Sequence, residues 1–226
     1  LNEVKIPENR THYELNLTLN YYTHYGIVEE IITYTNRSAQ VLEELLLSIP
    51  PKNYPGSFTL QSLSDADGNS ITNWREEGIN LYVPLAQPLQ PNQTTSLRLN
   101  FRLDFPTVEG TFGVSGRQTN LMNWYPYIPP YDETEGWITH PQQVVNNMVV
   151  GEYVVNEVAD FDVTLKLTDR EELIEVAASA PAVETNGMRS YHLELARGFA
   201  FSISDSYFEH EIVQDGVRIH SYVFME

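Results

Sequence analysis

Cysteine is absent from this sequence of 226 residues. Disulfide bonds, thiolate metal ligands and a cysteine nucleophile are therefore excluded. Positive charge is scarce: 13 Lys and Arg side chains stand against 31 Asp and Glu, which gives a formal net charge of −18. A surface this acidic repels nucleic-acid phosphates and anionic lipids, so we expect neither nucleic acid nor membrane as a partner.

Long hydrophobic runs are missing as well. No stretch approaches the roughly 20 consecutive apolar residues that a membrane-spanning helix needs, and no charged-then-apolar signal stands at the start. The chain begins with Leu1 rather than Met, which leads us to expect a processed product or a piece of a longer protein. The sequence determines no compartment, although an extracytoplasmic or cell-surface location is the one we favour.

What the sequence does contain is alternation of apolar and polar residues with a period of two. From residue 12 to residue 21 the apolar side chains share one face and the polar side chains occupy the other. The same pattern recurs over residues 27–35, 97–105 and 161–167. Such alternation is typical of half-buried strands. We therefore predict a single all-β domain, residues 1–226, built from two twisted antiparallel sheets.

Three dipeptides mark tight hairpins between strands: Asp67-Gly68, Asn186-Gly187 and Asp215-Gly216. Each supplies residues that tolerate the positive φ angles of primed turns. Two other segments, residues 38–49 and 169–178, are rich in helix-forming residues but lie between strands. We predict that both are short turns leading into strands, so that the domain has one short helix or none.

The clearest catalytic motif is only half present. His210-Glu211 begins the zinc-peptidase signature H-E-x-x-H, but Gln214 stands where the second histidine should be. The flanking residues alternate like a strand, in which residues four apart lie about 13 Å from each other and cannot share one ion. We therefore expect no zinc site there. The remaining histidines are scattered singly: His12, His24, His140, His192 and His220.

Several carboxylates cluster in sequence near Trp137, namely Asp132, Glu133, Glu135 and Glu152. A pair of carboxyl groups lined by aromatic side chains is what glycoside hydrolysis requires. A chain this acidic also contains such clusters by chance, without a function. A non-catalytic sugar-binding surface is a further interpretation of this cluster. The sequence contains no G-x-S-x-G nucleophile elbow and no glycine-rich nucleotide loop.

The order of features along the second half of the chain is more informative than any one motif. It runs through "NLMNWYPYIPPYDETEGW", "ADFDVTLKL", "EVAAS" and "GFAFSIS". The first half contributes "YELNLTL", "EEIITYTNRS", "LEELLLSIPPKNY" and "PLAQPLQPNQTTSLRLNF". From about Tyr13 to Phe208 the chain resembles the N-terminal β-domain of the aminopeptidase N family of zinc metallopeptidases, in a bacterial-type variant.

That resemblance implies a saddle-like β-sandwich without catalytic residues or metal ligands of its own. Its partners would be the catalytic domain of the same protein, which would follow Glu226 and carry H-E-x-x-H and the zinc ion, and a peptide substrate. In the family, a Thr-Gln pair before an aromatic–proline stretch reaches the substrate cleft. Here Thr119-Asn120 precedes that stretch at a shorter spacing.

By this resemblance Asn120 is the first candidate for peptide binding, and Asn123, Trp124 and Tyr125 are further candidates. Aromatic residues beside prolines are also typical of core packing, so the last two have a second interpretation. The alternative function, from a different class, is a self-standing β-sandwich module that binds carbohydrate or protein. A glycosidase that uses the acidic cluster near Trp137 is the third hypothesis.

Overall fold

The computed structural model describes residues 6–139, 144–145, 148–149 and 155–225. These residues form strands and two short 3-10 helices, η1 (Pro50–Asn53) and η2 (Glu171–Leu173). The prediction of an all-β fold is thus confirmed. No helix in the described part of the chain is long and apolar enough to cross a membrane.

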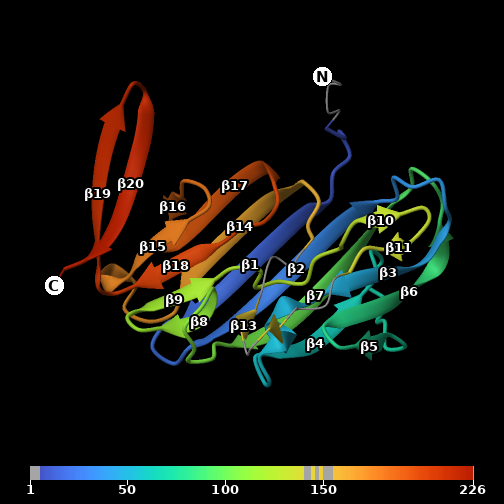
Figure 1. Ribbon diagram of the computed structural model, residues 1–226, viewed down its shortest axis with the longest axis horizontal. Helices are drawn as coiled ribbons and strands as arrows, with labels where there is room; N and C mark the ends of the chain where they lie inside the picture. The colour runs from blue at the N-terminus through green and yellow to red at the C-terminus, as the bar shows by residue number, and fades with distance from the viewer. Residues whose placement is uncertain (1–5, 140–143, 146–147, 150–154, 226) are drawn as a thin grey trace.

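A seven-stranded sheet runs through the whole body of the molecule (Figure 1). Its order is β16 (Val183–Thr185), β17 (Met188–Ala196), β14 (Ala159–Leu167), β1 (His12–Asn20), β2 (Tyr25–Thr35), β7 (Thr94–Asp104) and β4 (Phe58–Ser64). All neighbours are antiparallel except β1 and β14, which are parallel. The sheet is therefore mixed, because β14 reaches β1 only after the long intervening chain that a parallel pair requires.

Two smaller sheets lie on one face of the large sheet (Figure 1). One has the order β15 (Glu175–Ala178), β18 (Phe201–Ser204), β9 (Gln118–Leu121) and β8 (Phe112–Ser115). The other has the order β3 (Leu42–Ser48), β6 (Asn80–Leu89) and β5 (Arg75–Glu77). We expected two sheets, and the second layer is divided because the twist of a seven-stranded sheet prevents one flat sheet from covering its whole length.

Three two-stranded pairs complete the described strands. They are β10 (Tyr131–Asp132) with β11 (Gly136–Trp137), β12 (Val144–Val145) with β13 (Met148–Val149), and β19 (Tyr207–Gln214) with β20 (Val217–Phe224). The β19–β20 hairpin projects away from the layered body at one end of the molecule (Figure 1). It is the last element of the described chain.

The core lies between the large sheet and the two smaller ones. On β1 the alternating residues Tyr13, Leu15, Leu17 and Leu19 are buried, while the residues between them face solvent on the other side of the sheet. Burial of each such leucine stabilises the fold by about 1.5–3 kcal/mol. The period of two read from the sequence is therefore the pattern that separates the core face from the solvent face of the large sheet.

Two of the three predicted primed turns are confirmed. Asn186-Gly187 and Asp215-Gly216 each have two consecutive positive φ angles, and they join β16 to β17 and β19 to β20. At Asp67-Gly68 only the glycine has a positive φ. There the Asp65 carboxylate accepts hydrogen bonds from the backbone N–H groups of Asp67 and Asn69 at 3.0 and 2.8 Å, which stabilise a wider loop.

Both segments that are rich in helix-forming residues lead into strands, as predicted. Residues 38–41 are a turn before β3, and η2 directly precedes β15. Most of their apolar side chains, such as Leu45, Ile49 and Ile174, are buried in the core between the sheets, where packing outweighs intrinsic helix propensity. The short η1 helix was not predicted, and the Pro50-Pro51 pair forms its first turn.

Candidate functional site

Asn120 lies in the middle of β9, on the outer face of the four-stranded sheet. Its amide nitrogen donates a hydrogen bond to the Gly110 carbonyl oxygen at 2.9 Å, and its amide oxygen accepts one from the Ser202 hydroxyl at 2.7 Å. The neighbouring side chains Thr119 and Leu121 alternate inward and are buried. The Asn120 amide is thus held in one orientation, with one N–H and one oxygen lone pair left over for another molecule.

A chain of polar contacts links Asn120 to the projecting hairpin. The Ser202 hydroxyl lies 2.8 Å from the hydroxyl of Tyr207, the first residue of β19, and the Tyr207 hydroxyl lies 2.7 Å from the side-chain amide of Gln118. The Ser202 hydroxyl donates to the Asn120 amide oxygen, and the Tyr207 hydroxyl donates to the Gln118 amide oxygen. Asn120 and the hairpin base are therefore parts of one hydrogen-bonded network.

Small side chains surround Asn120 and leave a hollow over the sheet. In register across the strands, Ala177, Ser202, Asn120 and Gly113 form one row. A cavity of about 390 Å³ lies against this row, a volume typical of small-molecule or peptide subsites. Met122, which is exposed, stands at its border. The arrangement is a shallow, mainly apolar pocket with one fixed amide at its floor.

The other three predicted site residues lie elsewhere. Trp124 is fully buried and its indole N–H donates to the Phe199 carbonyl oxygen at 3.0 Å. Tyr125 is buried against Tyr13 and Phe161, and burial raises its pKa. Asn123 is half-buried in a left-handed backbone conformation and does not border the cavity. Trp124 and Tyr125 therefore belong to the core, which was their second interpretation.

Sequence reasoning missed Ser202 and Tyr207 at this site. Both residues are more than 80 positions from Asn120 in the chain. Only the alternation of "FAFSIS" distinguishes Ser202 locally, and the sequence around Tyr207 is that of an ordinary strand. Only the pairing of β18 with β9 brings Ser202 beside Asn120. Such a contact is a property of the sheet order, which no local pattern encodes.

The acidic cluster near Trp137 serves local structure. The Asp132 carboxylate accepts hydrogen bonds from the backbone N–H groups of Thr134 and Glu135 at 2.8 and 3.0 Å, and these bonds lower its pKa. Trp137 packs edge-to-face on Tyr131. A glycosidase acid needs a raised pKa instead. Glu152 lies outside the described residues.

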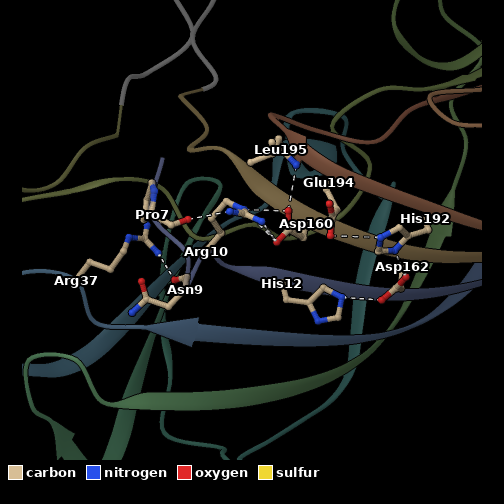
Figure 2. Close-up of polar contacts among 10 residues, drawn as sticks. All are labelled: Pro7, Asn9, Arg10, His12, Arg37, Asp160, Asp162, His192, Glu194 and Leu195. Atoms are coloured by element: carbon tan, nitrogen blue, oxygen red, sulfur yellow. Dashed lines mark hydrogen bonds and ion pairs between the residues drawn. The ribbon is translucent and has the colours of Figure 1, made fainter. Parts of the chain in front are cut away.

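A second polar cluster lies on the solvent face of the seven-stranded sheet (Figure 2). Asp162 on β14 stands between His12 on β1 and His192 on β17, at 2.8 and 2.7 Å. The hydrogen bond to Asp162 raises the pKa of His192. Burial alone would raise the pKa of Asp162, but the hydrogen bonds from His192 and His12 outweigh it and the pKa is lowered.

This cluster shows how isolated histidines come together through topology. His12 and His192 are 180 positions apart in the sequence, yet β14 pairs with both β1 and β17 and places Asp162 between them. Nearby, Arg10 forms an ion pair with Asp160 at 2.9 Å (Figure 2). Within the described residues no three His, Asp or Glu side chains converge in a way that could hold a metal ion.

The half signature His210-Glu211 lies on β19, as the alternation predicted. In the antiparallel register His210 pairs with Ser221 and Glu211 pairs with His220, so the two side chains point to opposite faces of the ribbon. They cannot form the helical ligand arrangement of a zinc peptidase.

The β19–β20 hairpin is amphipathic. One face carries Glu209, Glu211, Arg218, His220 and Tyr222. The other face carries Phe208, Ile212, Val217, Ile219 and Val223, whose side chains are between 39% and 60% exposed, together with the polar pair His210 and Ser221. A two-stranded ribbon is only marginally stable in water, and contiguous exposed apolar side chains mark interaction surfaces. We call the second set the apolar hairpin face.

No protein-family model matches this sequence, and no curated protein matches it. Solved structures do. The M1 zinc metallopeptidase from Deinococcus radiodurans superposes with a TM-score of 0.57 at 15% sequence identity. A mutant of that enzyme bound to a Tyr-Ser-Ala substrate gives a TM-score of 0.55 at 14% identity, and a mutant described as a two-domain enzyme bound to L-tryptophan gives 0.54 at 14% identity.

Each of these superpositions covers 94% of this chain but only 46% of the metallopeptidase chain. This chain thus spans about half the length of the enzymes that it matches, a coverage consistent with an N-terminal domain of such a protein. The resemblance inferred from the sequence is confirmed at the level of the fold: the described chain has the β architecture of one part of an M1 zinc metallopeptidase.

Proposed function

We propose that this chain is a non-catalytic domain of an aminopeptidase-like zinc metallopeptidase, which packs on the catalytic domain and helps to line the peptide cleft. The fold supports this proposal, because this chain matches only about half of each solved metallopeptidase. The other half of those enzymes has no counterpart in this chain. In this proposal the zinc ion and its ligands belong to the catalytic domain. The chain itself contributes a docking surface and one wall of the cleft.

The apolar hairpin face is the observation that carries the proposal. Five apolar side chains on one side of a projecting ribbon contribute little to stability while water surrounds them. They would stabilise the protein if another surface covered them. The hairpin is also the last described element of the chain. A domain that follows it in sequence is therefore well placed to pack on this face, or to pair with the free edges of the ribbon.

Asn120 supports the second half of the proposal. It borders the 390 Å³ cavity, and through Ser202 it is linked to Tyr207 at the base of the hairpin. Its remaining N–H and carbonyl oxygen suit a peptide backbone, which presents one acceptor and one donor per residue. We propose that Trp124 and Tyr125 position β9 from behind and that Asn123 shapes the adjoining turn.

The first test reads the coding sequence beyond Glu226. We expect a Gly-x-Met-Glu strand and an H-E-x-x-H helix within about one further domain, roughly 150 codons. A stop codon at this point, or an unrelated module, would contradict the proposal and favour a self-standing binding module.

The second test measures docking. The downstream polypeptide and this chain are produced as separate molecules and their dissociation constant is measured by calorimetry. We expect Ile212→Lys and Ile219→Lys to weaken binding at least tenfold, since each buries a charge in an apolar interface. Val41→Lys is the matched control: Val41 is 47% exposed and belongs to the β3 end of the molecule, so binding should not change. Equal affinity for all variants would rule out the hairpin as the docking surface.

The third test addresses the cleft. In the full-length enzyme, Asn120→Ala should raise KM for peptides about threefold to tenfold, the range expected for one lost hydrogen bond. The zinc content should stay unchanged. An unaltered KM would remove Asn120 from the peptide site and leave the docking proposal intact.

A further inference from the structure

A second groove lies between the polar face of the hairpin and the open edge of the four-stranded sheet. Its volume is about 760 Å³. One wall is the edge strand β15 with the residues that follow it, and the opposite wall is formed by Glu209, Arg218, His220 and Tyr222 of the hairpin. Arg189 and Tyr191 of β17 also line it. This groove is separate from the apolar hairpin face, because it adjoins the other side of the ribbon.

The β15 wall presents unpaired backbone groups. β15 is an edge strand, and its only partner among the described strands is β18. The Ser179 N–H donates to the Ala200 carbonyl oxygen at 3.1 Å, directly across the ladder. Because hydrogen-bonded pairs alternate in an antiparallel ladder, Ala177 and Glu175 also bond toward β18. The N–H and C=O groups of Val176 and Ala178 therefore point away from β18, toward the open edge.

The same wall allows a second main chain to approach closely. Residues 177–182 read Ala-Ala-Ser-Ala-Pro-Ala, a run with no large side chain. Pairing of a new strand requires the two backbones to lie about 4.7–4.9 Å apart. Large side chains do not stand in the way here, so the edge is open to an extended segment along its length.

A buried hydroxyl group without a partner lines the groove. The Tyr191 ring packs in the core against Phe199 and Phe201, with ring centroids 5.5 and 5.4 Å away. The residue is 4% exposed, yet its hydroxyl has no hydrogen-bond partner within the described chain. A buried hydroxyl left unpaired costs about 1–3 kcal/mol. A molecule in the groove that offers a donor or an acceptor would relieve this cost.

Among the charged side chains that line the groove, one carboxylate has no ion-pair partner within the described residues. Each cation has its own partner: Arg189 pairs with Glu184 at 2.7 Å, and Arg218 pairs with Glu211 at 3.1 Å. His220 pairs with Glu209. Glu175 is exposed at the start of β15, and its carboxylate forms no hydrogen bond or ion pair among the described residues. The groove therefore favours a positively charged occupant, in keeping with the net charge of −18.

We propose that this groove binds an extended, basic polypeptide segment from a separate molecule, which adds as a strand to the free edge of β15. Its backbone pairs with Val176 and Ala178. A Lys or Arg side chain lies beside Glu175, and a polar group of the segment meets the Tyr191 hydroxyl. Strand addition of this kind draws affinity from backbone hydrogen bonds and specificity from neighbouring side-chain sites.

The test uses the 226-residue chain and three fluorescent hexapeptides, with binding followed by fluorescence polarisation. The first peptide alternates Thr and Lys. The second alternates Thr and Glu, and the third is the Thr-Lys peptide N-methylated at every residue, so that neither backbone edge can donate. We expect the first peptide to bind and the other two to bind at least tenfold more weakly. Binding of the N-methylated peptide with equal affinity would overturn strand addition, and binding of none would overturn the site.

Amide resonances provide a direct readout of the pairing. In the isotope-labelled chain, the N–H signals of Val176 and Ala178 should shift on addition of the Thr-Lys peptide, and that of Ala177 should shift less because it is already bonded to β18. If the peptide binds but these two signals do not respond, it binds elsewhere and the proposal is wrong.

Two variants test the side-chain contacts. Tyr191→Phe removes only the unpaired hydroxyl, so it should not destabilise the fold, and it should weaken peptide binding about threefold to tenfold. Glu175→Gln should weaken binding and reduce its dependence on salt. Tyr82→Phe, on β6 in the other small sheet, is the control and should bind like the unmodified chain. Unchanged binding by both groove variants would remove Tyr191 and Glu175 from the site.

Discussion

At the scale of single residues, the most unusual group is a carboxyl buried in the core. Glu30 on β2 is 1% exposed, and neither of its oxygens has a hydrogen-bond partner within the described chain. In register it lies between Leu15 of β1 and Leu99 of β7. Burial raises its pKa well above the ordinary value. Glu30 is therefore neutral in the folded protein over a wide range of pH, because ionisation in this site would cost more than retaining the proton.

Glu30→Gln should make the protein more stable at neutral pH. Below about pH 4.3 the carboxyl is protonated in both the folded and unfolded states, and the two proteins should differ least. Above that pH the unfolded state releases the proton and the folded state keeps it. The wild type then loses stability relative to the variant by up to about 1.4 kcal/mol per pH unit, until the folded-state pKa is reached.

Urea unfolding between pH 4 and pH 8 measures this difference. Glu29→Gln is the matched control, since Glu29 directly precedes Glu30 on the same strand but faces solvent. The difference in unfolding free energy between wild type and Glu29→Gln should not grow with pH. A parallel pH dependence for wild type and Glu30→Gln would mean that Glu30 is ionised in the fold.

The shared carboxylate of Asp162 makes a second prediction at this scale. Its hydrogen bond is the largest cause of the raised pKa of His192, and Glu194 has a smaller effect. Asp162→Asn should therefore lower the pKa of His192 toward about 6.5, and Glu194→Gln should lower it less. The ring-proton resonance of His192, followed by NMR from pH 5 to pH 9, measures both. A pKa of His192 that stays raised in Asp162→Asn would show that Asp162 does not hold the imidazolium.

At the scale of elements, β8 depends on one glycine. Gly113 has a φ of +117°, and a Cβ atom at this position would lie 2.3 Å from the Pro106 carbonyl oxygen. That oxygen accepts a hydrogen bond from the Val114 N–H at 2.7 Å, which fastens β8 to the end of the preceding loop. Both the backbone angle and the lack of a side chain are therefore needed where β8 begins to pair with β9 beside Asn120.

Gly113→Ala should destabilise the domain by about 2–6 kcal/mol, the sum of backbone strain and steric overlap. Gly116→Ala isolates the first contribution: Gly116 also has a positive φ, of +62°, but nothing lies within 4 Å of its added Cβ. That change should cost only about 1–2 kcal/mol. Thermal or urea unfolding of both variants measures the difference. Equal destabilisation would mean that the contact with Pro106 relaxes without cost.

At the scale of the whole molecule, the large sheet separates two kinds of surface. One face is covered by the two smaller sheets and holds the core, and the other carries polar side chains such as the His12–Asp162–His192 cluster. Among the described residues, the projecting hairpin exposes several apolar side chains on one side. The layered body thus buries its apolar residues between the sheets, whereas the apolar hairpin face has no cover among the described residues.

The isolated chain should bind zinc far below one ion per molecule and should release no amino acid from peptide substrates. The described residues contain no converging set of metal ligands, and a zinc peptidase needs three protein ligands and an open position. Elemental analysis after dialysis, with a peptidase assay on the same sample, measures both. Stoichiometric zinc that survives dialysis would contradict the assignment of the metal to another part of the protein.

The alternation of apolar and polar residues predicted β1, β2, β7 and β14 of the large sheet, each within three residues of its observed ends. Prediction from sequence worked there because one buried face imposes a period of two. It also excluded a zinc site at His210-Glu211, because a strand cannot bring these side chains to one ion. The ordered motifs predicted the metallopeptidase-like fold that the solved structures share.

Tertiary structure alone decided which residues meet. Ser202 and Tyr207 reach Asn120, and His12 reaches His192, only because distant strands are neighbours in the sheets. Trp124 and Tyr125, which the motif placed among the candidate site residues, are buried in the core. Local sequence sets the face on which a side chain lies, because alternation is a property of each strand. The order of the strands depends on long-range pairing, and so the composition of the site, the groove beside β15 and the uncovered hairpin face emerged only from the fold.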